Sequence, residues 1–172
     1  MVEWHRVTRR DVLRAINEYV ACASQFLKGG NVLLVKNARG EEKPVLVKAG
    51  GQATEIPFAV LVNGGTASAA EIVAAALKDG HRGPLVGETT FGTGTVLSES
   101  KLSDGSALLL AMEEWLTPSG NVIWHKGITP NVVVALGPGS SPAFPETERT
   151  MSVKELQDSG DVQLVRAVEM LH

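Results

Sequence analysis

The chain has little of several things that would narrow its chemistry. Its 172 residues include one cysteine, Cys22, which excludes an intrachain disulfide and a cluster of thiolate metal ligands. Cys22 lies within an apolar helical pattern, where we expect a buried, unreactive thiol. No segment reaches the roughly 18 to 20 apolar residues of a membrane span. The net charge is −3, and neither sign of charge forms a long run, so nucleic acid and anionic lipid are not expected partners.

The N-terminus also lacks a feature of exported proteins. The first ten residues, MVEWHRVTRR, contain no apolar stretch that could form the core of a signal peptide. From the sequence as it stands we therefore expect a cytoplasmic protein. What the chain does contain is 44% hydrophobic and 20% charged residues, which is typical of a globular domain with a sizeable core.

Two segments have the apolar spacing of helices. Across residues 12–27 apolar side chains recur at steps of three and four, and Gly29-Gly30 follows as a stop. Residues 67–77 are rich in alanine, which has a high helix propensity, and this pattern ends near Asp79-Gly80. Both helices need a sheet on which to bury their apolar faces.

The other apolar runs predict strands. The run PFAVLV at residues 57–62 is apolar throughout and predicts a buried central strand. Asp104-Gly105 separates two β-rich runs and predicts a hairpin turn. Together with the helices, these strands predict a mixed α/β fold. Residues 31–37 and 43–49 lie on either side of the polar turn Ala-Arg-Gly-Glu-Glu and predict another hairpin. The remaining predicted strands are residues 84–87, 95–102, 106–112, 121–125 and 131–136.

The chain divides into three parts by composition. Residues 1–136 carry the predicted helices and strands of one core. Residues 137–150 contain Pro138, Pro142 and Pro145 and predict an extended linker. Residues 151–172 form a helical tail in which Asp161 can cap a last helix that docks on the core. We expect its docking face to consist of Val162, Val165, Val168 and Leu171.

The segment Gly64-Gly65-Thr66-Ala67-Ser68-Ala69-Ala70-Glu71 is a candidate for chemistry. It places Ser68 in the first turn of a helix that directly follows a buried strand. Unpaired N–H groups and the positive end of the helix dipole can stabilise an oxyanion there. The alternative is structural, because Ser68 and Glu71 also fit the Ser-x-x-Glu capping box.

The glycine-punctuated loop GETTFGTGTV, residues 87–96, raises the question of phosphate binding. It lacks the Gly-Lys-Ser/Thr ending of a P-loop, and it leads into a predicted strand, whereas a phosphate cradle leads into a helix. Nucleotide binding is therefore disfavoured for this loop.

These segments resemble a known family. VLVNGGTASAAEIVAAALKDGHRGPLVGETTFGTGTV, then LSDGSALLL, WLTPSGNVIWHKGITPNVVV and DVQLVRAVEML, are similar in order to the catalytic domain of the carboxyl-terminal processing, or tail-specific, proteases of peptidase family S41. The resemblance implies a ClpP/crotonase-like layered α/β fold. It implies cleavage of proteins near apolar C-terminal tails by a serine nucleophile and a lysine base, without metal, nucleotide or other cofactor. Family members are usually extracytoplasmic. The sequence is also compatible with a homo-oligomer.

The resemblance assigns roles to four positions. Ser68 matches the nucleophile, and the N–H of Ala69 matches one oxyanion donor. Thr93 stands at the position of the family lysine, and Leu97 at that of a glutamine that helps to hold the lysine. A threonine hydroxyl cannot act as a base near neutral pH, so the family's standard dyad is absent.

A second departure concerns the other oxyanion donor, a glycine that should fall near Leu13 and Arg14. The chain has no glycine before Gly29, and from the sequence as it stands we expect neither the family's PDZ domain nor its first core strands. Among substitute bases, Lys78 lies roughly 15 Å along the helix from Ser68, and His81 follows that helix in a loop. The remaining two candidates are His125, because histidine is the residue type that most often acts as a base near neutral pH, and Lys126, which matches a structural family position.

Three hypotheses stay open from the sequence. The first is an active peptidase in which an unidentified group activates Ser68. The second is an inactive scaffold that serves as a peptide-binding or assembly module, favoured by Thr93, Leu97 and the glycine-free start. The third is a mis-assigned or clipped N-terminus, which would explain the missing glycine turn and export signal and would leave Thr93 unexplained.

Overall fold

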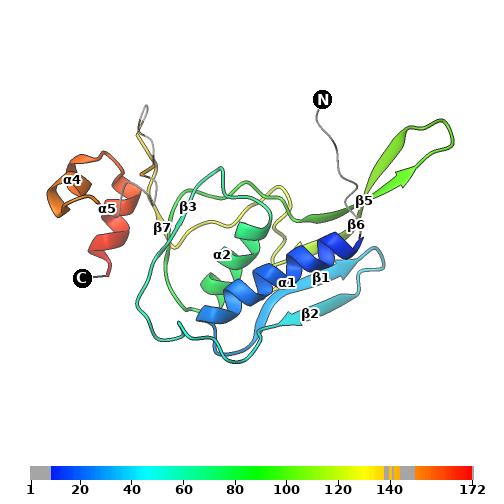
Figure 1. The fold of residues 1–172 in the computed structure, drawn as a ribbon, viewed down its shortest axis with the longest axis horizontal. Coiled ribbons are helices and arrows are strands. Elements are labelled where there is room, and N and C mark those ends of the chain that lie inside the picture. Colours follow the sequence, from blue (N-terminus) through cyan, green and yellow to red (C-terminus); the bar gives the residue numbers. More distant parts are fainter. Residues whose placement is uncertain (1–8, 138–139, 141, 144–149, 172) are drawn as a thin grey trace.

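A computed structural model describes residues 9–137, 140, 142–143 and 150–171 (Figure 1). Helix α1 is followed by three strands and helix α2 by four, and two short helices follow at the end. This order agrees with the predicted mixed α/β class. The elements are α1 (Arg9–Phe26), β1 (Asn31–Asn37), β2 (Glu42–Leu46), β3 (Val60–Val62), α2 (Ala69–Asp79), β4 (Leu85–Gly87), β5 (Thr95–Lys101), β6 (Ala107–Leu116), β7 (Val132–Val133), α4 (Val153–Asp158) and α5 (Val162–Glu169).

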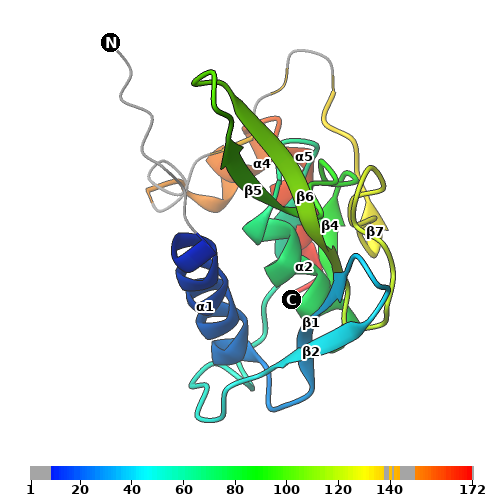
Figure 2. The same ribbon diagram turned by 90° about the vertical axis from the view of Figure 1, so that its right-hand side faces the viewer.

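The described strands form two sheets. The first is antiparallel, with the order β2-β1-β6-β5, and the second is parallel, with the order β3-β4-β7. Helix α2 packs against α1 and β1, as Figures 1 and 2 show. Because α2 follows β3 directly, its first turn lies where the parallel sheet ends. The candidate segment around Ser68 occupies this junction.

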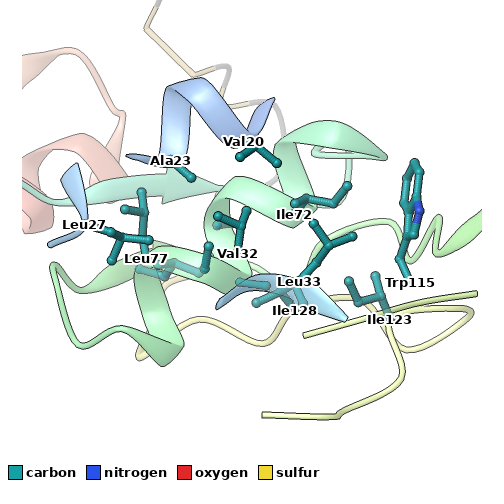
Figure 3. Packing of buried hydrophobic residues seen from close by; sticks show 14 of the residues in the cluster. Val20, Ala23, Leu27, Val32, Leu33, Ile72, Leu77, Trp115, Ile123 and Ile128 are labelled. Atoms are coloured by element: carbon teal, nitrogen blue, oxygen red, sulfur yellow. The ribbon is translucent and has the colours of Figure 1, made fainter. Parts of the chain in front are cut away.

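A hydrophobic core holds α1 and α2 against both sheets (Figure 3). It joins side chains from α1, α2, β1, β3, β4 and β6 with the segment that follows β6. Burial of each large apolar side chain contributes about 1.5–3 kcal/mol to folding. This packing fixes α2, and with it the position of Ser68. The labelled members are Val20, Ala23, Leu27, Val32, Leu33, Ile72, Leu77, Trp115, Ile123 and Ile128.

Helix α1 confirms the spacing prediction but corrects the one for Cys22. Val20, Ala23 and Leu27 face the core at helical steps, as expected. Cys22 is exposed, because a residue two positions after Val20 lies on nearly the opposite side of the helix. The small polar residue that is buried is Ser24, whose hydroxyl donates to the carbonyl of Val20 at 2.5 Å and accepts from the N–H of Lys48 at 2.9 Å.

The prediction of a buried central strand at residues 57–62 was wrong. The strand there, β3, is three residues long and lies at the edge of the parallel sheet as described, with β4 as its neighbour. Leu61 is 39% exposed. An apolar run indicates a preference for extended, buried backbone, but it does not determine how many neighbouring strands the run acquires.

The strand predicted at residues 121–125 was also wrong. In that segment one isolated bridge joins Val122 to Leu116. The N–H groups of Lys126 and Gly127 both donate to the carbonyl of Ile123, at 3.0 and 2.9 Å, and turn the chain. The run at 131–136 contributes the two-residue strand β7, whereas both predicted hairpins, β1–β2 and β5–β6, are confirmed.

Helix α5 begins where predicted but buries a different face. The carboxylate of Asp161 accepts from the N–H of Leu164 at 2.9 Å, which caps the helix. Gln163 and Ala167 are buried, whereas Val162 and Leu171 of the predicted face are exposed. The side-chain amide of Gln163 donates to the carbonyl of Val134 at 2.8 Å, and α5 contacts β3 and β4. A polar residue thus lies on the docking side, which apolar spacing alone does not reveal.

The predicted linker at residues 137–150 falls largely outside the described residues. After it, α4 has a capping box that the sequence analysis passed over, in which the hydroxyl of Ser152 accepts from the N–H of Glu155 at 3.3 Å. Among the helices described, none has the length and apolar character needed to cross a bilayer.

Candidate functional site

Ser68 lies at the junction between β3 and α2, after a turn held by its own side chains. The side-chain oxygen of Asn63 accepts from the N–H of Gly65 at 2.9 Å, and the hydroxyl of Thr66 accepts from the N–H of Asn63 at 3.0 Å. Ser68 follows as the N-cap of α2, with φ 56° and ψ −119°. A positive φ is costly for a residue with a side chain, and such strain is concentrated at functional sites.

The capping role of Ser68 runs through its backbone. Its N–H donates to a carboxylate oxygen of Glu71 at 2.9 Å, and the N–H of Glu71 donates to the Ser68 carbonyl at 3.0 Å. Ser68 and Glu71 thus form the capping box that their spacing predicts, and Ser68 is half-buried.

Glu71 is the centre of the site. Its carboxylate is fully buried and accepts four hydrogen bonds. One oxygen accepts from the hydroxyl of Thr90 at 2.5 Å and the N–H of Gly92 at 2.7 Å, and the other accepts from the N–H groups of Ser68 and Thr93, at 2.9 and 2.7 Å. A buried carboxylate needs such donors to replace its lost hydration. Ser68 and Thr93 thus meet at one oxygen atom.

The loop that carries Thr93 is held from its other side by residues 123–128. The hydroxyl of Thr90 accepts from the N–H of Ile128 at 2.7 Å, and the carbonyl of Gly92 accepts from the N–H of His125 at 3.0 Å. A Cβ on Gly94 would lie 2.6 Å from the nitrogen of Trp124. The glycines of this loop therefore permit close approach between two chain segments, which agrees with the interpretation against a phosphate cradle.

The four predicted site residues are not all in one place. Ser68 and Thr93 are joined through Glu71, and Ala69 is the first residue of α2, at the end where unpaired N–H groups are found. Leu97 lies on β5, half-exposed and opposite Ala111, outside the Glu71 hydrogen bonds. Their catalytic roles stay predictions.

The substitute bases occupy other positions. The ammonium of Lys78 donates to the carbonyl of Thr129 at 2.7 Å, and His81 is exposed. The N–H of His125 donates to the carbonyl of Gly92. The same peptide group, between Gly92 and Thr93, donates its N–H to Glu71. Because the two groups of a trans peptide point in opposite directions, the backbone of His125 lies on the far side of the loop from Glu71.

The predicted glycine turn and the role of Glu71 both differ from what the sequence indicated. Leu13 and Arg14 lie within α1, so the predicted position of the glycine turn is helical. The sequence analysis missed the role of Glu71 and Thr90, because Ser-x-x-Glu was interpreted only as a cap. A signal was present, since a carboxylate in an otherwise apolar helix that becomes buried requires several donors nearby.

The chain is similar in sequence to a known protein family and to several of its members. A family model described as peptidase family S41 matches residues 15–134. The carboxy-terminal processing protease CtpA of Bacillus subtilis is 45% identical over 109 residues, which are 63% of this chain and 23% of that protein. The carboxyl-terminal-processing protease of Synechocystis sp. is 35% identical over 149 residues, which are 87% of this chain and 32% of that protein.

A solved structure is similar as well. The photosystem II D1 C-terminal processing protease aligns with a TM-score of 0.67 and 33% sequence identity, over 77% of this chain and 34% of that one. The chain therefore spans about a quarter to a third of the length of these relatives.

Proposed function

This chain belongs to peptidase family S41, and on that basis we propose that it forms the nucleophile-bearing part of a serine-type endopeptidase. The proposed substrates are proteins with apolar C-terminal tails, in keeping with the processing proteases named among its relatives. The observation that carries the proposal is the buried carboxylate of Glu71, which holds the strained backbone of Ser68 beside the loop of Thr93. This arrangement uses four hydrogen bonds to position a serine at a helix N-terminus.

In this proposal the Ser68 oxygen attacks a peptide carbonyl, and the N–H of Ala69 and the positive end of α2 stabilise the oxyanion. A base must take the proton from the serine hydroxyl. Thr93 occupies the place of the family lysine and cannot do so, and Leu97 replaces the glutamine. Slow turnover is therefore expected from the chain with Thr93.

A second candidate function is an inactive scaffold that binds peptides or takes part in assembly. Thr93 supports it directly, because this residue lies within two hydrogen bonds of Ser68 and brings no titratable group to that position. The two candidates differ in whether Ser68 reacts and whether peptide is cleaved.

One experiment separates them. The chain and its Ser68→Ala, Thr93→Lys and Thr89→Lys variants are incubated with a fluorophosphonate probe and with a fluorogenic peptide that has an apolar C-terminal tail. We expect Ser68-dependent labelling and a cleavage rate that Thr93→Lys raises about 100-fold or more, since general-base catalysis contributes about 10²–10⁴-fold. Thr89→Lys is the matched control, because Thr89 is exposed in the same loop and outside the Glu71 hydrogen bonds.

The outcome that favours the scaffold is equally definite. If the parent chain and Thr93→Lys label and cleave no faster than Ser68→Ala, the peptidase proposal fails. Peptide binding without cleavage, measured by fluorescence anisotropy, would then support the second function.

A further inference from the structure

The β5–β6 hairpin stands clear of the rest of the molecule (Figure 1). It exposes apolar side chains on both faces. Residues opposite each other on the two strands, such as Ser98 and Leu110 or Glu99 and Leu109, share a face, and the faces alternate along each strand. Exposed patches of this kind mark interaction surfaces. Within residues 97–112 of the hairpin, the large apolar residues that are exposed are Leu97, Leu102, Leu108, Leu109, Leu110 and Met112.

The outer half of β6 also has an open edge. Pairing with β1 begins at Glu113, opposite Asn37, whereas residues 107–112 have β5 on one side and no strand on the other within the described chain. An open edge presents unpaired N–H and C=O groups to any strand that approaches.

This edge differs from the other two edges of the same sheet. β2 carries Glu42, Lys43 and Pro44, and β5 carries Glu99 and Lys101, which are residues that discourage edge pairing. The outer half of β6 reads Ala-Leu-Leu-Leu-Ala-Met, with no charge, proline or glycine over six residues. One edge is thus left unprotected, and it is the most apolar of the three.

The residues on this edge are self-complementary. The run from Ala107 to Ala111 is a palindrome, Ala-Leu-Leu-Leu-Ala. An antiparallel pair of two such strands about a two-fold axis at Leu109 places alanine opposite alanine and leucine opposite leucine at every position. Two-fold interfaces require this property, because the same surface must serve both partners.

We propose that the outer half of β6 pairs antiparallel with the same segment of a second copy of this chain. The pairing forms a four-stranded ribbon, β5-β6-β6-β5, in which Leu108, Leu109 and Leu110 of each hairpin lie against the same residues of the other. Leu109, which is 63% exposed in the single chain, meets its counterpart at the axis. This interface does not depend on the activity of Ser68.

Leu109→Lys tests the proposal, because it places two like charges opposite each other at the axis. In sedimentation equilibrium we expect a monomer–dimer equilibrium for the parent chain. The variant should have a dissociation constant raised about 100-fold or more. Leu102→Lys is the matched control: Leu102 is 50% exposed on the same hairpin but lies outside the paired segment, so the dimer should persist. Circular dichroism checks that both variants fold.

A cross-linking experiment tests the register. In a Cys22→Ala background, which removes the exposed native thiol, Leu109→Cys should form a disulfide-linked dimer under mild oxidation. Opposed residues in antiparallel strands have Cα atoms about 4.5–5.5 Å apart, within the range that a disulfide spans. Leu102→Cys should form little of this product.

Three results would overturn the proposal. These are a parent chain that stays monomeric up to about 100 times the concentration used for folding assays, a dimer that survives Leu109→Lys, and equal cross-linking at positions 109 and 102. The second would assign any dimer to another surface, and the third would indicate unspecific association.

Discussion

At the scale of single residues, Glu71 is the side chain on which the site depends. Four donors from two segments, the start of α2 and the loop 90–93, converge on its two oxygens, with no exposure to water. Three backbone N–H groups and one hydroxyl donate to it, and its two oxygens provide an acceptor for each of these donors. The same group fixes the first turn of α2 and the loop of Thr93.

Glu71→Gln is expected to lower the free energy of unfolding by about 2–4 kcal/mol, since its NH2 group would face N–H donors that then lose their acceptor. Urea denaturation followed by circular dichroism measures this change. The control is Glu99→Gln on exposed β5, for which we expect less than about 0.5 kcal/mol. Similar losses for both variants would mean that the buried hydrogen bonds contribute little.

Ser68 illustrates what could and could not be predicted at this scale. Its position at a helix N-terminus after a strand follows from local signals: the Gly-Gly turn, the alanine-rich helix and the Ser-x-x-Glu spacing. Its positive φ and its link to Thr93 through Glu71 do not, because they depend on a loop more than 20 residues away in sequence. Cys22 was predicted to be buried because its neighbours in the sequence are apolar, although it lies on the opposite face of the helix from Val20.

At the scale of elements, glycines set how closely the loop of Thr90–Thr93 can approach its neighbour. Gly127 has φ +65°, and a Cβ there would lie 2.2 Å from the carbonyl oxygen of Thr90. No side chain can be accommodated without moving one of the two backbones. The contact also supports the hydrogen bonds between Thr90 and Ile128.

Gly127→Ala should therefore lower the free energy of unfolding by about 2–4 kcal/mol, from the clash together with the positive φ. Gly120→Ala is a matched control, because Gly120 has φ +81° and a Cβ added there would meet no other atom within 4 Å. It should cost about 1 kcal/mol, the backbone component alone. Thermal or urea unfolding of both variants measures the difference, and equal losses would contradict the proposed clash.

The elements that the sequence predicted well are those with local pairing. Helices α1 and α2 and the two hairpins form between neighbouring residues, so spacing and turn signals suffice. Strands β3 and β7 are shorter than predicted, and residues 121–125 form no strand. Their pairing partners are distant in sequence, and an apolar run carries no information about them.

At the scale of the whole molecule, the two sheets are joined by a long connection between β2 and β3. It has no regular structure and is held by Arg82, whose guanidinium donates to the carbonyls of Ala53 and Ile56 at 2.7 and 2.6 Å. The same group lies 4.7 Å from the centre of the Phe58 ring. Arg82, which lies between α2 and β4, therefore holds the β2–β3 connection against the rest of the molecule.

Arg82→Met keeps the apolar stem and removes both hydrogen bonds and the charge. We expect hydrogen exchange of amides in residues 52–58 to become at least about tenfold faster, which corresponds to about 1.4 kcal/mol of lost local stability. Arg39→Met, in the exposed β1–β2 turn, is the control and should leave these amides unchanged. Unchanged exchange in Arg82→Met would show that other contacts hold the connection.

The family, the α/β class, the main helices and hairpins, and the positions of Ser68 and Thr93 can all be predicted from the amino-acid sequence. Motifs and periodicities are local, so they can be recognised without knowing the fold. Four other properties are visible only in the folded chain: a buried carboxylate joins Ser68 to Thr93, Cys22 is exposed, β3 is an edge strand, and α5 docks through Gln163. These properties arise from contacts between segments far apart in the chain, and burial and pairing are properties of such contacts.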